Sequence, residues 1–180
     1  MEVLLCLNDN NIFGLPPPTS SALNRVICPI PTGSRTYVST LSLLGLSLIL
    51  FGSILRLVCF RKLGNLFTFD LTMFPAHTLV TSGPYAYVRH PSYTGTLALC
   101  TGLALVNLSA GSWMVECGIL GRGAISTVVR VLGPSAWMTW WFAVGVTRCR
   151  SEDEELKKKF GVQWDTYAAH VKAWFVPGLL

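Results

Sequence analysis

The chain has 180 residues, enough for one domain with a substantial core. Apolar residues make up 51% of the chain, charged residues only 13%, and the mean hydropathy is +0.49. This composition excludes a disordered chain and an ordinary soluble protein, and it favours an integral membrane protein. The net charge of +5 is modest and no nucleic-acid-binding motif accompanies it, so we expect no nucleic acid partner.

The first 36 residues contain Pro16, Pro17 and Pro18 among scattered polar residues and show no periodicity. This pattern predicts a poorly ordered N-terminal segment over 1–36, followed by a membrane domain over 37–180. The six cysteines do not have the spacing of metal ligands, so we expect no metal site, and we expect most of them to be free thiols that act as small apolar residues.

Three apolar stretches predict membrane-spanning helices, over about 37–60, 93–110 and 124–147. A helix of about 22 residues, rising ~1.5 Å per residue, crosses a hydrocarbon layer of ~30 Å. In the first span, Gly45 and Gly52 would allow a neighbouring helix to approach closely. Arg56, near the end of that span, is expected to extend toward Arg61 and Lys62 at the membrane surface.

A polar stretch, residues 77–93, lies between the first two spans and contains two histidines, an arginine, two prolines and three tyrosines. Gly83 and Pro84 predict a turn, and Pro91 is suited to the first turn of the next helix. Backbone groups left unpaired between two such breaks are tolerated at membrane depth only around a cavity or a ligand. We therefore interpret the stretch as one wall of a binding site; an ordinary polar loop is the alternative.

The tail, residues 148–180, begins with Arg148 and Glu152, which share a face if the segment is helical. They face the binding site in one interpretation and form a solvated ion pair in the other. Gly161 is a good helix C-cap. Beyond it, five residues at helical spacing predict a C-terminal helix lying in the membrane interface: Trp164, Tyr167, Ala168, Val171 and Trp174.

The polar stretch and the tail are expected on the same side of the membrane, because an out-and-back pair of spans separates them. The loop between the second and third spans has only one basic residue, Arg122. Nine basic residues belong to the side of the polar stretch and the tail: Arg61, Lys62, Arg89, Arg148, Arg150, Lys157, Lys158, Lys159 and Lys172. The positive-inside rule therefore predicts that both segments are cytosolic. A pocket between them would open to the cytosol for one ligand and to lipid for another, which suits a lipid-linked substrate.

Three motifs now stand in order: His77-x-Leu-Val-Thr-x-Gly-x-Tyr85, Arg89-His-Pro-Ser-Tyr93-x-Gly95 and Arg148-x3-Glu152-x7-Phe160-Gly161. Over roughly residues 60 to 180 they resemble the isoprenylcysteine carboxyl methyltransferases, and the form of the tail resembles the fungal branch. The resemblance implies an all-α, multi-pass enzyme of the endoplasmic reticulum membrane with a cofactor site facing the cytosol and C-terminal interfacial helices. Such an enzyme transfers a methyl group from S-adenosylmethionine to the C-terminal carboxylate of a protein with a farnesylated or geranylgeranylated cysteine, in contact with membrane lipid.

The resemblance also implies residue roles. Arg148 would be the catalytic residue that meets the substrate, and the cofactor would be surrounded by ten residues: His77, Thr78, Leu79, Val80, Tyr85, His90, Pro91, Ser92, Tyr93 and Glu152. The residue types agree with this chemistry. A carboxylate is already ionised at neutral pH, so a fixed guanidinium is needed rather than a general base. Aromatic rings and a carboxylate favour a cationic sulfonium. His77 and His90 are expected to donate hydrogen bonds and not to act as bases.

The chain also departs from the family pattern. The family usually has more spans before the site, so with one such span this chain would be a truncated or minimal version. Asp70 stands where many relatives have glutamine, which leaves that cofactor contact open. Three alternative functions remain: a phospholipid N-methyltransferase, a sterol-reductase-like membrane enzyme, and an inactive truncated scaffold.

Overall fold

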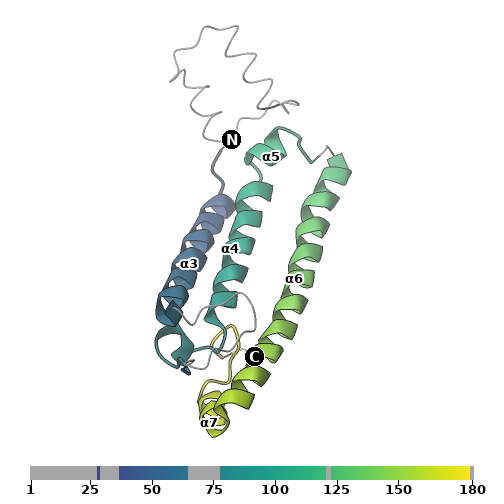
Figure 1. Cartoon of the computed structure of the whole chain (residues 1–180). Coiled ribbons are helices and arrows are strands. Elements are labelled where there is room, and N and C mark those ends of the chain that lie inside the picture. Colours follow the sequence, from purple (N-terminus) through teal and green to yellow (C-terminus); the bar gives the residue numbers. More distant parts are fainter. Residues whose placement is uncertain (1–27, 29–36, 65–77, 121–122, 179–180) are drawn as a thin grey trace. The chain divides into compact units, whose positions relative to one another are not determined.

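The computed structural model describes residue 28 and residues 37–64, 78–120 and 123–178. Its helices are α3 (Thr40–Leu63), the 3-10 turn η2 (Gly83–Ala86), α4 (Pro91–Leu108), α5 (Trp113–Glu116), α6 (Gly123–Phe160) and α7 (Val162–His170) (Figure 1). These described residues include no strand, which confirms the all-α class. Three predictions fall on residues outside this description: the poor order of segment 1–36 apart from residue 28, the cofactor contact at Asp70, and the role of His77.

Helices α3 and α4 are the two described helices that are long and apolar enough to cross a membrane. The mean hydropathy reaches 2.3 in α3 and 1.4 in the stretch Pro91–Glu116. Only 17% and 22% of these windows are buried within the protein, so most of their apolar side chains face outward. This is the pattern of helices whose surroundings are lipid, because a soluble protein would bury them. The first two predicted spans are thus confirmed as helices, the first beginning three residues later and the second two residues earlier than predicted.

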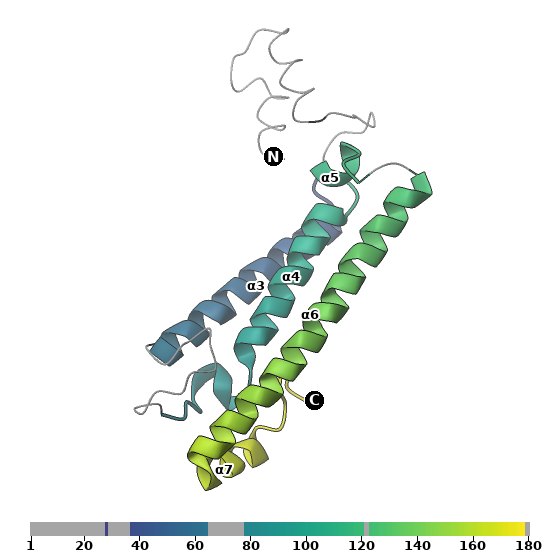
Figure 2. The same ribbon diagram turned by 45° about the vertical axis from the view of Figure 1, so that its right-hand side comes forward.

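The third predicted span lies within α6, which does not stop at Arg148 but continues to Phe160 (Figure 2). Among the described helices, α6 is not apolar enough to qualify as a membrane span, so a third crossing stays a prediction. The charged segment after Arg148 extends the helix because glutamate and lysine are good helix formers. Gly161, with φ of +51°, follows the last helical residue, as predicted for a C-cap.

The chain divides into two compact units, and within each unit α3 packs on α4 (Figures 1 and 2). In the unit formed by residues up to Ser47 and Thr101–Trp137, a Cβ on Gly45 would lie 2.7 Å from the carbonyl oxygen of Gly102. In the unit formed by Leu48–Cys100 and Met138–Leu180, a Cβ on Gly52 would meet the backbone of Gly95 and Leu99. Both predicted close approaches are therefore present, with backbone packed on backbone.

Arg56 has specific partners on α4, and its expected extension toward Arg61 and Lys62 stays a prediction. Its Nη1 donates to the hydroxyl of Thr96 and to the carbonyl oxygen of Ser92, at the beginning of α4. The guanidinium also lies 5.0 Å from the centroid of the Phe60 ring. A charged group within an apolar helix needs such polar partners, and α4 supplies them.

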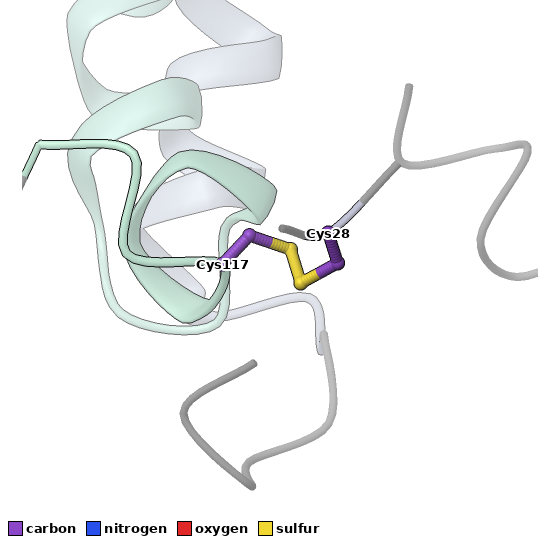
Figure 3. Close-up of a disulfide and its surroundings, with 2 residues drawn as sticks. All are labelled: Cys28 and Cys117. Carbon is purple, nitrogen blue, oxygen red and sulfur yellow. A yellow bond between two sulfur atoms is a disulfide. The ribbon is translucent and has the colours of Figure 1, made fainter. Parts of the chain in front are cut away.

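Cys28 and Cys117 form a disulfide, which corrects the expectation of free thiols for these two residues (Figure 3). They are 89 residues apart in the sequence, so spacing alone could not have paired them. Cys59, Cys100 and Cys149 are free, as expected.

Candidate active site

Two local breaks position the polar stretch, as the sequence predicted. The first is the η2 turn, in which Gly83 has φ of +67°, a conformation that favours glycine. The second lies before Pro91, the first residue of α4. Proline is tolerated there because the first helical N–H has no intrahelical partner. Arg89 and His90 are therefore held in a non-helical segment directly before the helix begins.

The C-terminal segment after α7 pairs with these two residues. The N–H groups of Arg89 and His90 donate to the carbonyl oxygens of Ala173 and Trp174, at 3.0 and 2.9 Å. The hydroxyl of Thr94 donates to the carbonyl oxygen of Phe175 at 2.5 Å. The predicted helix through Trp174 was therefore wrong, since α7 ends at His170. These backbone donors of the polar stretch are satisfied by the tail and not by a cavity or ligand.

The apolar face of α7 packs against protein, and its position in the membrane interface stays a prediction. Trp164 and Tyr167 are buried, together with Val171, against Leu79 and side chains of α6. The hydroxyl of Tyr167 also donates a hydrogen bond of 2.7 Å to the carbonyl oxygen of Tyr85. Burial raises the pKa of Tyr167 to about 12, so this hydroxyl stays protonated and acts as a donor. Helix α7 thus packs against the polar stretch and is hydrogen-bonded to it.

Glu152 is the centre of the site. Its Oε1 accepts hydrogen bonds from the hydroxyl of Tyr93, at 2.8 Å, and from Nε of Arg148, at 3.1 Å. Its Oε2 lies 3.4 Å from Nδ1 of His90. Three residues that the sequence singled out therefore contact the carboxylate of a fourth, Glu152. They come from α4, α6 and the segment between η2 and α4.

Asp153 is a functional candidate that sequence reasoning missed. Its Oδ1 lies 2.8 Å from Nε2 of His90, and its Oδ2 accepts a hydrogen bond of 2.6 Å from Nη1 of Arg89. Only 13% of the Asp153 side chain and 5% of the His90 side chain are exposed. In the sequence Asp153 stands in the acidic run 152–155, which is typical of a solvated helix face, so no local signal separated it from its neighbours.

The two carboxylates fix the charge of His90. Both ring nitrogens face carboxylate oxygens, which only accept, so both must carry a proton. Burial disfavours the cation, but contacts with Asp153, Cys149 and Glu152 outweigh burial and hold the pKa of His90 well above its usual value. Burial likewise raises the pKa of Glu152, yet His90 and Tyr93 reverse this, so the net pKa is lowered. An imidazolium cannot accept a proton, and the role of His90 as a hydrogen-bond donor stays a prediction.

An aromatic wall adjoins this cluster. The Tyr93 ring lies 6.3 Å from Trp141 and 6.4 Å from Phe175, centroid to centroid, and His90 meets it edge-on at 5.9 Å. Nε1 of Trp174, also edge-on to His90, is a buried donor with no partner in the described part of the chain. Rings and a carboxylate suit an organic cation, and an unpaired buried donor suits a polar group of a ligand. These residues therefore fit a cationic ligand that also carries a hydrogen-bond acceptor.

The remaining predicted residues are less closely grouped. Pro91 is buried, the Ser92 carbonyl oxygen is bound by Arg56, and burial raises the pKa of Tyr85 above its usual value. Leu79 borders an open hollow of about 640 Å³ beside α7, which Thr81 and Tyr167 also line. None of His90, Tyr93, Arg148 and Glu152 lines this hollow. Thr78 is exposed and Val80 is partly buried.

The comparisons with known proteins identify the family of the chain. Residues 43–157, well over half of the chain, match the model of the isoprenylcysteine carboxyl methyltransferase (ICMT) family. The match extends from α3 through Glu152 and Asp153. No solved structure matches the chain.

Curated relatives carry the same family name. The chain is 37% identical over 86 residues to protein-S-isoprenylcysteine O-methyltransferase of Xenopus laevis, covering 42% of this chain and 30% of that protein. It is 32% identical over 129 residues to protein-S-isoprenylcysteine O-methyltransferase B of Arabidopsis thaliana, covering 71% of this chain and 55% of that protein. The Rattus norvegicus enzyme is 43% identical over 60 residues, covering 32% of this chain and 21% of that protein.

The chain spans at most about half of the length of these relatives. None of the three is fungal, so the likeness to the fungal branch stays a prediction. The family itself rests on the longer match, which includes both the polar stretch and the beginning of the tail. The chain belongs to the isoprenylcysteine carboxyl methyltransferase family.

Proposed function

We propose that the chain transfers a methyl group from S-adenosylmethionine to the C-terminal carboxylate of a prenylated cysteine in a membrane-bound protein. The observation that carries the proposal is the meeting of Arg148, Tyr93 and His90 at the carboxylate of Glu152. A cation-binding carboxylate and a guanidinium stand side by side there. A reaction between a sulfonium donor and a carboxylate acceptor requires this pair of charges in one place.

The proposed reaction is an in-line displacement that needs no proton transfer. S-adenosylmethionine supplies an electrophilic methyl group on a sulfonium; an oxygen–carbon bond forms as the sulfur–carbon bond breaks, and both charges disappear. Arg148 holds the acceptor carboxylate in a fixed orientation through its planar guanidinium. Glu152 and the Tyr93 ring face the donor cation, and the surrounding aromatic side chains keep water away. Two opposite charges that neutralise each other react faster where water is excluded.

Other parts of S-adenosylmethionine have candidate contacts in the same unit. The unpaired Nε1–H group of Trp174 would donate a hydrogen bond to an oxygen of S-adenosylmethionine. The hollow beside Leu79 and Tyr167 has a volume within the range of small-molecule sites, and its lining by Leu79 supports a role for the predicted block 77–80 in binding the adenosyl group. Tyr85 adjoins the hollow, because its carbonyl oxygen accepts a hydrogen bond from Tyr167, which lines it.

The localisation we propose is the endoplasmic reticulum membrane, with the site facing the cytosol. Helix α4 begins at the site and leads to Cys117, so if α4 crosses the bilayer these two places lie on opposite sides. Disulfides persist in oxidising compartments, and the Cys28–Cys117 disulfide therefore supports a lumenal position for that end of α4. The basic residues at the other end support the same orientation independently.

Labelling of introduced cysteines in sealed microsomes tests this orientation. Lys158→Cys places a thiol at an exposed position of α6. Ile119→Cys places one two residues after Cys117, where 42% of Ile119 is exposed. A membrane-impermeant maleimide should label the first variant directly and the second only after permeabilisation, with the parent chain as background. The reverse pattern would contradict the orientation.

The activity is tested with membranes containing the chain, S-adenosylmethionine labelled in its methyl group, and N-acetyl-S-farnesylcysteine. We expect base-labile methyl ester on the cysteine analogue and its loss in Arg148→Ala. Lys158→Ala is the matched control, because it removes a cation from an exposed position of the same helix. Label in phospholipid instead would support a phospholipid methyltransferase, no label would support a scaffold, and full activity of Arg148→Ala would overturn the substrate role.

A further inference from the structure

We propose that Asp153 is a positioning residue of the methyl-transfer site, which fixes the ring of His90 with both nitrogens as donors and so sets the charge that the donor meets. This inference rests on the proposed function. Asp153 itself contacts His90 and Arg89, and through them it acts on the cluster around Glu152.

The geometry of Asp153 gives it control over two elements. Its Oδ1 meets Nε2 of His90 at 2.8 Å and its Oδ2 meets Nη1 of Arg89 at 2.6 Å. Arg89 is itself tied to the tail, where Nη2 donates to the carbonyl oxygen of Lys172 at 2.9 Å and the guanidinium lies 5.5 Å from the Trp174 ring. One carboxylate therefore links α6 to the segment before α4 and, through Arg89, to the C-terminal segment.

The orientation of His90 depends on this contact. Nε2 makes a short hydrogen bond with Asp153, whereas Nδ1 is 3.4 Å from Oε2 of Glu152, a longer ion pair. The side chain of Cys149 also hydrogen-bonds the ring, Tyr93 meets it edge-on, and Trp174 and Phe175 are uncharged. Loss of the Asp153 carboxylate would remove the shorter of the two carboxylate contacts that orient the ring.

The charge argument is independent of orientation. The cluster contains three cations, Arg89, His90 and Arg148, and two carboxylates, Glu152 and Asp153. Without the charge of Asp153 the cationic excess rises, at a buried place where screening is weak. A cationic sulfonium donor would then bind less well, whereas an anionic acceptor would not. A purely structural role for Asp153 predicts no such difference between the two substrates.

The test compares Asp153→Asn with the parent chain. Asparagine keeps the shape of the side chain but replaces one acceptor oxygen by an NH₂ group, which is a donor. That group cannot accept the hydrogen bond of either Arg89 or His90, so one of the two contacts is lost. We expect kcat/KM to fall roughly 10- to 100-fold, with KM rising for S-adenosylmethionine and not for farnesylcysteine. Asp165→Asn is the matched control, because it breaks an exposed ion pair with Lys157 in the same unit and should leave all three constants unchanged. Asp153→Glu should restore part of the activity.

Titration of the histidine ring by NMR provides a measurement that does not depend on activity. The chain has three histidines, and His90→Gln assigns the signal. We expect the His90 midpoint to fall in Asp153→Asn and the alkaline limb of the pH–activity profile to shift in the same direction. An unchanged midpoint, or unchanged kinetic constants, would overturn the inference. Absence of methyl transfer by the parent chain would instead refute the proposed function, and the ring titration would still decide the role of Asp153.

Discussion

The hydroxyl of Tyr93 donates a hydrogen bond of 2.8 Å to Oε1 of Glu152, and so the first turn of α4 is joined to α6 at a carboxylate. The two residues are 59 positions apart in the sequence. This bond brings the polar stretch and the beginning of the tail together, and it aims one aromatic ring and one carboxylate at the place that we propose for the donor.

Tyr93→Phe removes this bond but keeps the ring. Hydrogen bonds to charged groups contribute about 1.5–3 kcal/mol, so we expect the affinity for S-adenosylmethionine to fall roughly tenfold or more. Glu152→Ala should weaken the affinity further, because it also removes the anion. Tyr87→Phe is the control, since 72% of Tyr87 is exposed. Isothermal titration in detergent measures the affinity, and unchanged binding by both site variants would count against the donor site.

Arg148→Lys tests the need for a planar guanidinium. An ammonium is a point charge and cannot hold a carboxylate in a fixed plane, so we expect kcat to fall by about 10- to 100-fold while the variant still folds. Arg61→Lys makes the same exchange at the exposed end of α3 and should retain full activity. The measurement is steady-state methyl transfer to farnesylcysteine. Full activity of the Arg148 variant would refute the geometric role.

Gly52→Val tests the close packing of α3 on α4. A side chain there would meet the backbone of Gly95, which cannot move aside as a flexible side chain can. Overpacking of this kind costs about 1–3 kcal/mol, so the midpoint of thermal unfolding should fall. Gly133→Val is the control because a Cβ there has nothing within 4 Å. Equal midpoints for the two variants would show that the helices do not pack at Gly52.

The pH dependence of stability follows from the two shifted groups of the cluster. The pKa of His90 is raised on folding, so its contribution is complete below about 6.5 and is lost as the pH rises through the folded value. The pKa of Glu152 is lowered, so its contribution is present above about 4.5 and is lost as the pH falls through the folded value. The cluster should therefore be most stabilising between these limits.

Thermal unfolding across the pH range measures this dependence. His90→Gln should remove most of the loss on the alkaline side, and a difference of 1 kcal/mol corresponds to about 2–4 °C in the midpoint. His170→Gln is the control, since His170 is exposed at the end of α7. If the His90 variant loses stability with rising pH as steeply as the parent chain does, His90 is not the group responsible.

Local signals predicted the parts of the fold that depend on neighbouring residues. The apolar runs gave α3 and α4, Pro91 gave the start of α4, and Gly161 gave the end of α6. The grouping of His90, Tyr93, Arg148 and Glu152 was also predictable, because an out-and-back pair of spans returns the chain to the same side.

The remaining features depend on contacts between distant segments. The end of α7 at His170 reflects the pairing of the following residues with Arg89 and His90, and this pairing overrides the helical spacing up to Trp174. The side chain of Arg56 donates hydrogen bonds to Thr96 and Ser92 of α4, and only the fold brings these acceptors near it. Asp153 looked like its acidic neighbours, because only the fold shows which of them is buried.

A structure of the protein with S-adenosylhomocysteine and S-farnesylcysteine tests the central claim most directly. We expect the thioether sulfur beside Glu152 and the Tyr93 ring, and the carboxylate of the farnesylcysteine on the guanidinium of Arg148. A cofactor bound away from Glu152, or a carboxylate that Arg148 does not contact, would contradict the account.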